Sequence, residues 1–209
     1  MTVINAILEA EEIARTCKAA IFDLDDTLYL EKSYVKSGYK AVATAFPQIK
    51  NMQEKLWTAF LRGGKAIDEV LQSENAFTQE NKEKCLQVYR FHTPTIALYD
   101  GVEDMLKSLK KSGVKLGLIT DGRSEGQRAK IKALGIEKLF DSIVITDELG
   151  GVEYRKPNEK AFVFTCERLG VAFADAVYIG DNLKKDFIAP AKLGMKSCYF
   201  RNPDGLYTE

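Results

Sequence analysis

Three aspartates crowd into the stretch AAIFDLDDTLYL, at Asp23, Asp25 and Asp26. Two carboxylates about 4 Å apart repel each other by roughly 4 kcal/mol at an effective dielectric constant of about 20. On an extended chain alternate side chains share a side, so Asp23 and Asp25 can face one way while Asp26 turns away. Carboxylate oxygens, together with the carbonyl of Asp25, suit a hard divalent cation, and Mg²⁺ fits best. The stretch therefore predicts a magnesium site.

Distant segments supply the other charged groups that such a site needs. Asp181, with Asp186 beside it, would complete an acidic pocket, and Lys156 would balance part of its charge. The four carboxylates carry a formal charge of −4, and Mg²⁺ with the lysine supplies +3, which leaves −1. Protonation of one carboxyl group would neutralise the site. Asp25 is the candidate for that proton, which would make it a general acid.

This set of groups is suited to phosphoryl transfer. A phosphate would bind through the metal, Lys156, the Thr120 hydroxyl and backbone N–H groups at helix starts. Asp23 is placed to attack phosphorus and form an aspartyl-phosphate, a known form of covalent catalysis by carboxylates. Asp25 would protonate the leaving oxygen and then deprotonate the water that hydrolyses the intermediate.

The segments that must position these residues alternate between strand and helix patterns. Strands are expected at residues 18–23, 114–120, 140–146, 175–180 and 195–200. Helices, several of them ending at a glycine, are expected at residues 101–113, 124–135, 158–170 and 184–194. This alternation predicts a doubly wound α/β, Rossmann-like fold with a mostly parallel sheet of about five strands. Ligands bind beyond the carboxyl ends of such strands, where the polar residues named above collect.

Two further segments lie outside this alternation. Residues 2–17 carry apolar side chains at helical spacing, which predicts an additional N-terminal amphipathic helix. Residues 30–98 contain many helix formers and few strand signals, so we expect a helical insertion there.

The composition excludes several classes of protein. Lys plus Arg and Asp plus Glu both number 30, so the chain lacks the positive charge expected of a nucleic-acid or anionic-membrane binder. Neither a signal peptide nor a run of about 18 apolar residues is present, and we expect a cytoplasmic protein. Scattered cysteines and a single histidine favour reduced thiols over disulfides or a zinc site.

Four short motifs in a fixed order resemble those of the haloacid dehalogenase-like hydrolase superfamily. The resemblance covers about residues 18–203 and rests on DLDDTL at 23–28, LIT at 118–120, RKPN at 155–158 and GDNLKKD at 180–186. It implies that Asp23 is the nucleophile and Asp25 the general acid and base. Thr120 would be the phosphate-binding hydroxyl and Lys156 the motif lysine. Mg²⁺ would be held by Asp23, the Asp25 carbonyl and Asp181.

The resemblance also implies a domain organisation. Residues 1–29 and 99–209 would form the α/β catalytic core, with residues 1–17 as an extra helix. Residues 30–98 would form a small helical cap, inserted after the first motif, that closes over small substrates.

Two positions leave open questions at the sequence level. The family commonly has TNG where this chain has Thr120, Asp121 and Gly122; we expect these residues and Lys156 to bind substrate, although a carboxylate at position 121 could weaken phosphate affinity. Asp186 is expected to support the site as a partner of Lys156 rather than to bind the metal directly.

The expected function is Mg²⁺-dependent hydrolysis of a small phosphate monoester, such as a sugar phosphate or nucleoside monophosphate. A phosphomutase is the nearest alternative, but such enzymes usually carry Gly-Val where this chain has Asp26-Thr27. A dehalogenase would have little use for Asp181. A non-catalytic binding protein that retains the fold is the alternative from another class. The expected partner is a small phosphorylated metabolite, with the chain a monomer or homodimer.

Overall fold

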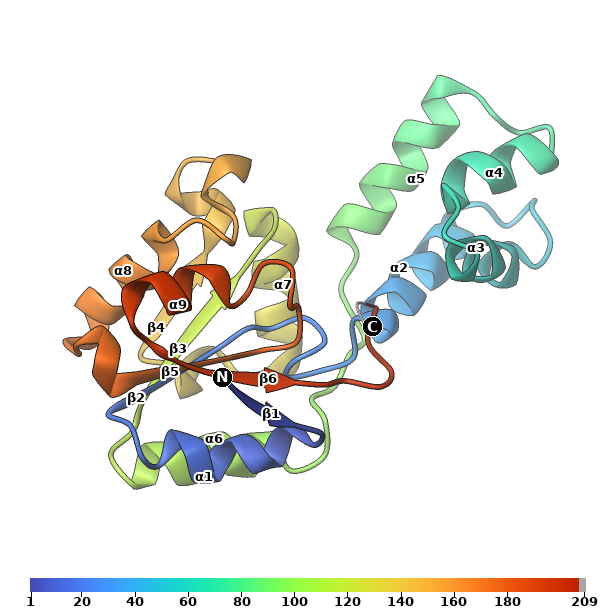
Figure 1. The fold of residues 1–209 in the computed structure, drawn as a ribbon. Coiled ribbons are helices and arrows are strands. Elements are labelled where there is room, and N and C mark those ends of the chain that lie inside the picture. The colour runs from blue at the N-terminus through green and yellow to red at the C-terminus, as the bar shows by residue number, and fades with distance from the viewer. Residues whose placement is uncertain (207–209) are drawn as a thin grey trace. The chain divides into compact units, whose positions relative to one another are not determined.

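The computed structural model describes residues 1–206, and within them six strands form one sheet (Figure 1). The strand order is β1-β6-β5-β2-β3-β4, and each pair of neighbours is parallel. The strands are β1 (Thr2–Ile4), β2 (Ala19–Phe22), β3 (Lys115–Thr120), β4 (Ser142–Ile145), β5 (Ala176–Gly180) and β6 (Lys196–Phe200). The chain thus has the predicted α/β doubly wound fold with a parallel sheet.

Helices cover both faces of this sheet. Two of them, α1 and α6, lie side by side along one face, while α8 and α9 lie on the opposite face (Figure 1). The helices of this part are α1 (Ala10–Ala14), α6 (Val102–Lys111), α7 (Ser124–Leu134), α8 (Lys160–Leu169) and α9 (Ile188–Leu193). Four of the five are followed by a glycine within two residues, and at Gly135, Gly170 and Gly194 that glycine has the positive φ typical of a helix end.

Strand β2 lies in the middle of the sheet and is buried on both faces. Its four residues, AAIF, are fully inaccessible to solvent. Ile21 belongs to the apolar cluster that contains Phe162 of α8 and Tyr178 of β5, whereas Phe22 points the other way and makes an edge-to-face contact with Phe140. A continuous apolar run is what a doubly covered parallel strand requires. Because this buried strand is held on both faces, the position of the next residue, Asp23, is fixed at the carboxyl end of the strand.

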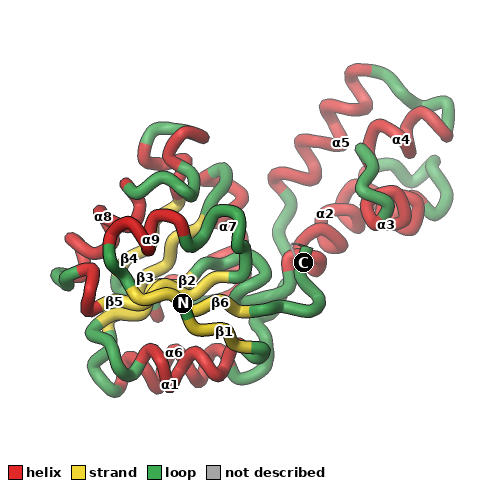
Figure 2. The backbone as a smooth tube through the Cα atoms, in the orientation of Figure 1, coloured by secondary structure: helices red, strands yellow, loops and turns green. Residues whose placement is uncertain are grey.

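The remaining helices form a second compact unit, residues 32–96 (Figure 2). This unit has its own apolar core. The first unit consists of Met1–Glu31 and the chain from Ala97 onward. Leu56 and Leu71 are fully buried in the second unit, and Trp57 stacks on Phe60 there. The helices concerned are α2 (Glu31–Ala45), which starts at the boundary, α3 (Met52–Leu61), α4 (Ala66–Ser73) and α5 (Gln79–Phe91).

The prediction of one helix over residues 2–17 was wrong. Thr2–Ile4 forms the edge strand β1, Ile7–Glu9 a 3-10 turn, and only Ala10–Ala14 an α-helix. Thr2, Val3 and Ile4 pair with Cys198, Tyr199 and Phe200 of β6, so the described sheet has six strands rather than five. Thr2, Val3 and Ile4 all have β-branched side chains, which favour a strand. The edge of the sheet at β6 offers unpaired backbone groups with which this segment can pair.

None of the helices within residues 1–206 has the length and apolar character needed to cross a bilayer. The four cysteines of the sequence are free thiols, and three of them are buried.

Candidate active site

The central strands of the sheet bring the sequence motifs to one edge. Asp23 follows β2, Asp181 follows β5 and Thr120 ends β3, and these three strands are direct neighbours in the sheet. Because parallel strands end on the same side, residues far apart in the chain meet beyond their carboxyl ends. The loop before α8 adds Lys156, whose ammonium group reaches Asp23.

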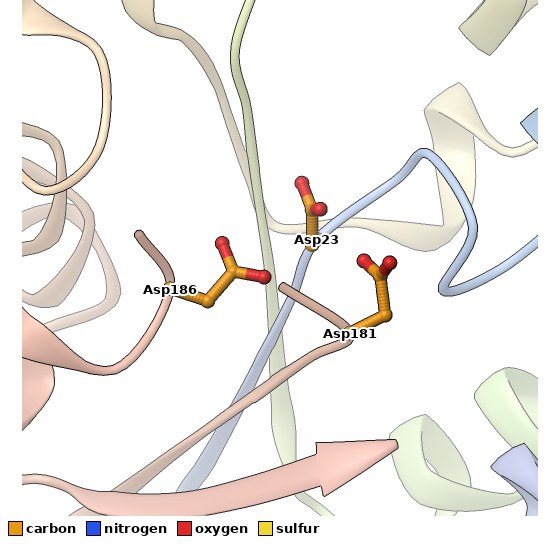
Figure 3. A group of neighbouring side chains, drawn as sticks. All are labelled: Asp23, Asp181 and Asp186. Carbon is orange, nitrogen blue, oxygen red and sulfur yellow. The ribbon is translucent and has the colours of Figure 1, made fainter. Parts of the chain in front are cut away.

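Three buried carboxyl groups form an acidic cluster at this edge. Asp23, Asp181 and Asp186 each offer one oxygen atom, and these atoms lie within 4.8 Å of one another. Their carboxyl groups turn toward a common space (Figure 3). The residues are 3%, 5% and 0% exposed, so water screens their mutual repulsion poorly. The cluster needs positive charge close by.

Lys156 supplies one of these positive charges. Its Nζ atom lies 2.7 Å from Asp23 Oδ1 and 2.9 Å from Asp186 Oδ1, and it donates to the Tyr178 hydroxyl at 2.9 Å. Burial alone would lower the pKa of Lys156, but Asp186 and Asp23 raise that pKa well above its usual value. The lysine is therefore a permanent cation between two carboxylates.

The charge of Lys156 does not fully balance the cluster. Burial raises the pKa of Asp23 to about 6, with Lys156 opposing and Asp186 adding to the rise. Burial, with the charges of Asp23, Asp186 and Asp26, also raises the pKa of Asp181 to about 8. Clustered carboxylate oxygens with residual negative charge are the donor set that a hard divalent cation prefers. The residues present thus fit Mg²⁺.

Asp25 directs its carboxylate to a different set of partners. Oδ1 accepts hydrogen bonds from Lys130 Nζ at 2.7 Å and from the Tyr29 hydroxyl, and Oδ2 accepts one from Gln127 Nε2 at 2.9 Å. Burial would raise the pKa of Asp25, but the Lys130 ammonium, the tyrosine and the glutamine hold that pKa below its usual value. In this geometry Asp25 is a carboxylate, so the expectation that it holds the proton that neutralises the site is wrong for the free protein, because the Lys130 ammonium stabilises its ionised form.

Asp26, the third aspartate of the first motif, turns away from the cluster as predicted and ties the surrounding loop together. Its carboxylate accepts from the backbone N–H groups of Glu31 at 2.8 Å and Leu206 at 2.7 Å. Its own carbonyl accepts from Asn202 Nδ2 at 2.7 Å. Asp26 has a φ of 53°, a left-handed conformation that aspartate tolerates better than most residues.

Asp121 is held in a structural network at the edge of the site. It accepts hydrogen bonds from the Thr146 hydroxyl and the Lys156 backbone N–H, both at 3.0 Å, and forms an ion pair with Lys185 at 3.0 Å. Burial would raise the pKa of Asp121, but Lys156 and Lys185 lower it. Its negative charge is therefore neutralised by neighbouring lysines.

A cavity of about 380 Å³ opens beside these groups. Of the residues expected to act on substrate, it is lined by Asp23, Asp25, Asp121 and Lys156. Thr120, which is fully buried, and Gly122, which is partly buried, are not among its lining residues. The complete lining is Asp23, Asp25, Glu31, Asp121, Arg155, Lys156, Asp181, Asn182 and Lys185. The cavity has room for a small anionic molecule.

Comparison with known proteins identifies the family. Residues 20–200 match the model of the haloacid dehalogenase-like hydrolase family. The chain belongs to this family. The hydrolase is 31% identical over 198 residues to the glyceraldehyde 3-phosphate phosphatase of Methanopyrus kandleri, an alignment that covers 88% of this chain and 84% of that protein. The expectation of this family from four sequence motifs is confirmed.

Two solved structures have the same fold as this chain. The HAD phosphatase from Thermococcus onnurineus shares 27% identity with a TM-score of 0.57, over 91% of this chain and 89% of that one. The HAD-hydrolase YfnB from Bacillus subtilis, solved with bound magnesium, shares 20% identity with a TM-score of 0.62, over 88% and 86% of the two chains.

Sequence reasoning missed several polar residues of the hydrolase site. Gln127 and Lys130 of α7 bind Asp25, and Lys185 lines the cavity. One signal was available for the first two. Positions 127, 130, 131 and 134 form one helical stripe, and in an ordinary core-facing helix all four would be apolar. Polar residues at the first two positions indicate that this end of the stripe faces a polar site.

Proposed function

We propose that the protein is a Mg²⁺-dependent phosphatase that hydrolyses small phosphate monoesters through an aspartyl-phosphate on Asp23. The observation that supports this most directly is the position of Asp23. It lies at the end of the central strand β2, 2.7 Å from Lys156, with oxygens of Asp181 and Asp186 within 4.8 Å. Family membership and relatives that carry phosphatase names favour the same reaction.

Mg²⁺ would be held by the carboxylates of Asp23 and Asp181 and by the main-chain carbonyl of Asp25. The ion would neutralise charge on the transferring phosphoryl group. Buried oxygen donors with raised pKa values support this assignment, and a fold neighbour was solved with magnesium. Asp186, which pairs with Lys156 at 2.9 Å, orients that lysine.

In the first step an oxygen of Asp23 attacks phosphorus, and the bond between phosphorus and the leaving oxygen breaks. Asp25, a carboxylate in the free protein, would take up a proton before this step and give it to that leaving oxygen, so an alcohol departs. Lys156 stabilises charge on the phosphoryl oxygens, and the Thr120 hydroxyl donates to one of them.

In the second step the Asp25 carboxylate takes a proton from water, whose oxygen attacks phosphorus. The bond between phosphorus and Asp23 breaks, and inorganic phosphate leaves. Asp23 returns as a carboxylate and Asp25 as the protonated acid, so the cycle consumes one water per ester.

The substrate proposed is a small phosphorylated metabolite, either a sugar phosphate or a nucleoside monophosphate, acted on in the cytoplasm. Since the Methanopyrus relative is named for glyceraldehyde 3-phosphate, that compound is the first to test. The helical unit of residues 32–96 is proposed to act as the cap domain that selects the leaving group.

The test is hydrolysis of p-nitrophenyl phosphate and of a metabolite panel, with Mg²⁺ and with EDTA. We expect turnover that needs Mg²⁺ and falls by on the order of 10³-fold or more in Asp23→Asn. The matched control is Asp175→Asn. Asp175 directly precedes β5 and so lies at the amino-terminal ends of the strands, away from the site, where it pairs with Lys18 at 2.9 Å. That variant should retain wild-type activity.

Other outcomes would contradict the proposal. Unchanged turnover in EDTA would remove the metal from the mechanism, and full activity of D23N would remove the nucleophile. Movement of phosphate between positions of one sugar without release of free phosphate would indicate a phosphomutase. Absence of turnover across the panel, with metabolite binding retained, would indicate a binding protein.

A further inference from the structure

Helix α7 buries two polar side chains that an ordinary core helix would expose. Gln127 is 4% exposed and Lys130 is 5% exposed, although both residue types are usually at the surface. They lie three residues apart and therefore on one face of the helix. Burying an ammonium group is costly unless it is paired, so these positions need an explanation in terms of their partners.

The shared partner is the Asp25 carboxylate. Lys130 Nζ lies 2.7 Å from Oδ1 and Gln127 Nε2 lies 2.9 Å from Oδ2, so each oxygen of the carboxylate receives one donor from α7. The Tyr29 hydroxyl also donates to Oδ1. Donors on both oxygens fix the rotation of the carboxyl group as well as its position.

Gln127 has a second contact, with Thr120. Its Nε2 group carries two hydrogens, and it donates one to Asp25 and the other to the Thr120 hydroxyl oxygen. The hydroxyl acts as an acceptor in that bond, so its own hydrogen is directed to another group. A phosphate oxygen is the acceptor that the proposed function would place there.

The loop before α7 leaves space for this arrangement. Gly122 has a φ of 138°, and a Cβ atom at that position would lie 3.3 Å from the Cδ and Cγ atoms of Gln127. A larger residue would therefore press on the side chain that joins Thr120 to Asp25. Two features therefore favour glycine at position 122: the close contact with the Gln127 side chain and the positive φ of the backbone.

We propose that Gln127 and Lys130 are positioning residues that hold the Asp25 carboxyl group in the orientation needed for its two proton transfers. This inference rests on the proposed function. Neither side chain exchanges a proton with the substrate. Asp25 gives its proton to the leaving oxygen in the first step and takes one from water in the second, and both transfers depend on the direction of its oxygens.

The test uses Gln127→Met and Lys130→Met, which keep most of the side-chain volume and remove the donors. With p-nitrophenyl phosphate, whose leaving group departs without a proton, the first step should stay within about threefold of wild type. Hydrolysis of the phosphoenzyme should fall by about 10²-fold, so a burst of nitrophenolate near one equivalent per site should appear. With an alkyl phosphate, the first step itself should fall by about 10²-fold.

Three further variants make the result specific. Lys132→Met lies on the exposed side of the same helix and should behave as wild type. Asp25→Asn should show the same burst as the two positioning variants. Asp23→Asn should show neither burst nor turnover; if it remains active, the proposed function fails rather than this inference.

The inference is overturned if D23N is inactive while Q127M lowers the burst rate and the steady-state rate by the same factor for both kinds of substrate. That result would mean that the glutamine only stabilises the fold. Unchanged kinetics in Q127M would overturn it as well. If K130M does not fold, which circular dichroism would show, Q127M alone decides the outcome.

Discussion

Asp23 and Asp181 are carboxyl groups whose pKa values burial raises to about 6 and about 8. In the unfolded chain an aspartate titrates near its ordinary value of 3.8. A carboxyl group with a raised pKa stabilises the folded state below its unfolded pKa, and that contribution is lost as pH rises through the folded pKa. Groups with lowered pKa values, such as Asp25 and Asp121, are already ionised above about pH 5.

The metal-free protein should therefore lose thermal stability between about pH 5 and about pH 8.5. Mg²⁺ binds ionised carboxylates, so saturating Mg²⁺ should raise the Tm more at about pH 8.5 than at about pH 5. Differential scanning fluorimetry at the two pH values measures this, with Asp181→Asn as the comparison variant, in which both effects should shrink. An equal Mg²⁺ shift at both pH values would contradict the site.

The sequence predicted which residues meet at the site, but not the direction of every side chain. Asp23 and Asp181 could be grouped because each directly follows a strand that ends at the same edge of the sheet, and Lys156 because it lies in the connection from β4 to α8, which starts at that edge. The direction of the Asp25 carboxylate could not be predicted. It is set by Lys130, 105 positions away, and the burial of that lysine depends on how α7 packs.

Among the elements, β3 and α8 approach each other unusually closely at Gly117. A Cβ atom there would lie 2.9 Å from Thr165 Cγ2, 3.1 Å from Ile21 Cγ1 and 3.3 Å from Leu169 Cδ1. Contacts shorter than 3.0 Å force a shift of the packed groups. The glycine thus sets the distance at which α8 covers the strand that ends at Thr120.

Gly117→Ala should lower the free energy of unfolding by about 1–3 kcal/mol, because it overpacks the interface between strand and helix. Thr165→Ser removes the nearest methyl group but keeps the hydroxyl that donates to the Ala161 carbonyl at 2.7 Å. The double variant should therefore be more stable than the sum of the two single effects predicts. Urea unfolding of all four proteins measures the coupling, and strict additivity would contradict the close contact.

At the level of elements, local patterns predicted most of the sheet but not its first strand. The five strands and four helices expected in the α/β part each have a counterpart, although α9 covers only Ile188–Leu193 of the helix expected over residues 184–194. Strand β1 was missed because its partner, β6, lies almost 200 residues away in the chain. Apolar spacing within Thr2–Ile4 does not distinguish a short strand from a helical turn.

On the scale of the whole molecule, each of the two units has a separate apolar core. The cluster around Leu56 and Leu71 draws its members from residues 32–96, and the cluster around Ile21 and Phe162 draws its members from the other unit. Units with separate cores can open separately.

Leu56→Ala in α3 should destabilise its own unit by about 2–5 kcal/mol and increase amide hydrogen exchange within residues 32–96. The matched variant Leu106→Ala, which removes a fully buried leucine from α6, should raise exchange in the α/β unit instead. Exchange followed by mass spectrometry separates the two regions. Equal loss of protection in both units from either variant would mean that the chain unfolds as one cooperative body.

The proposed reaction requires that phosphate is carried on Asp23 during turnover. The most direct measurement is acid quenching of Asp25→Asn during reaction with p-nitrophenyl phosphate, followed by borohydride reduction and peptide mapping. An acyl phosphate on Asp23 would be reduced there, so homoserine is expected at position 23. Phosphate on another residue, or turnover with no modified peptide at all, would contradict it.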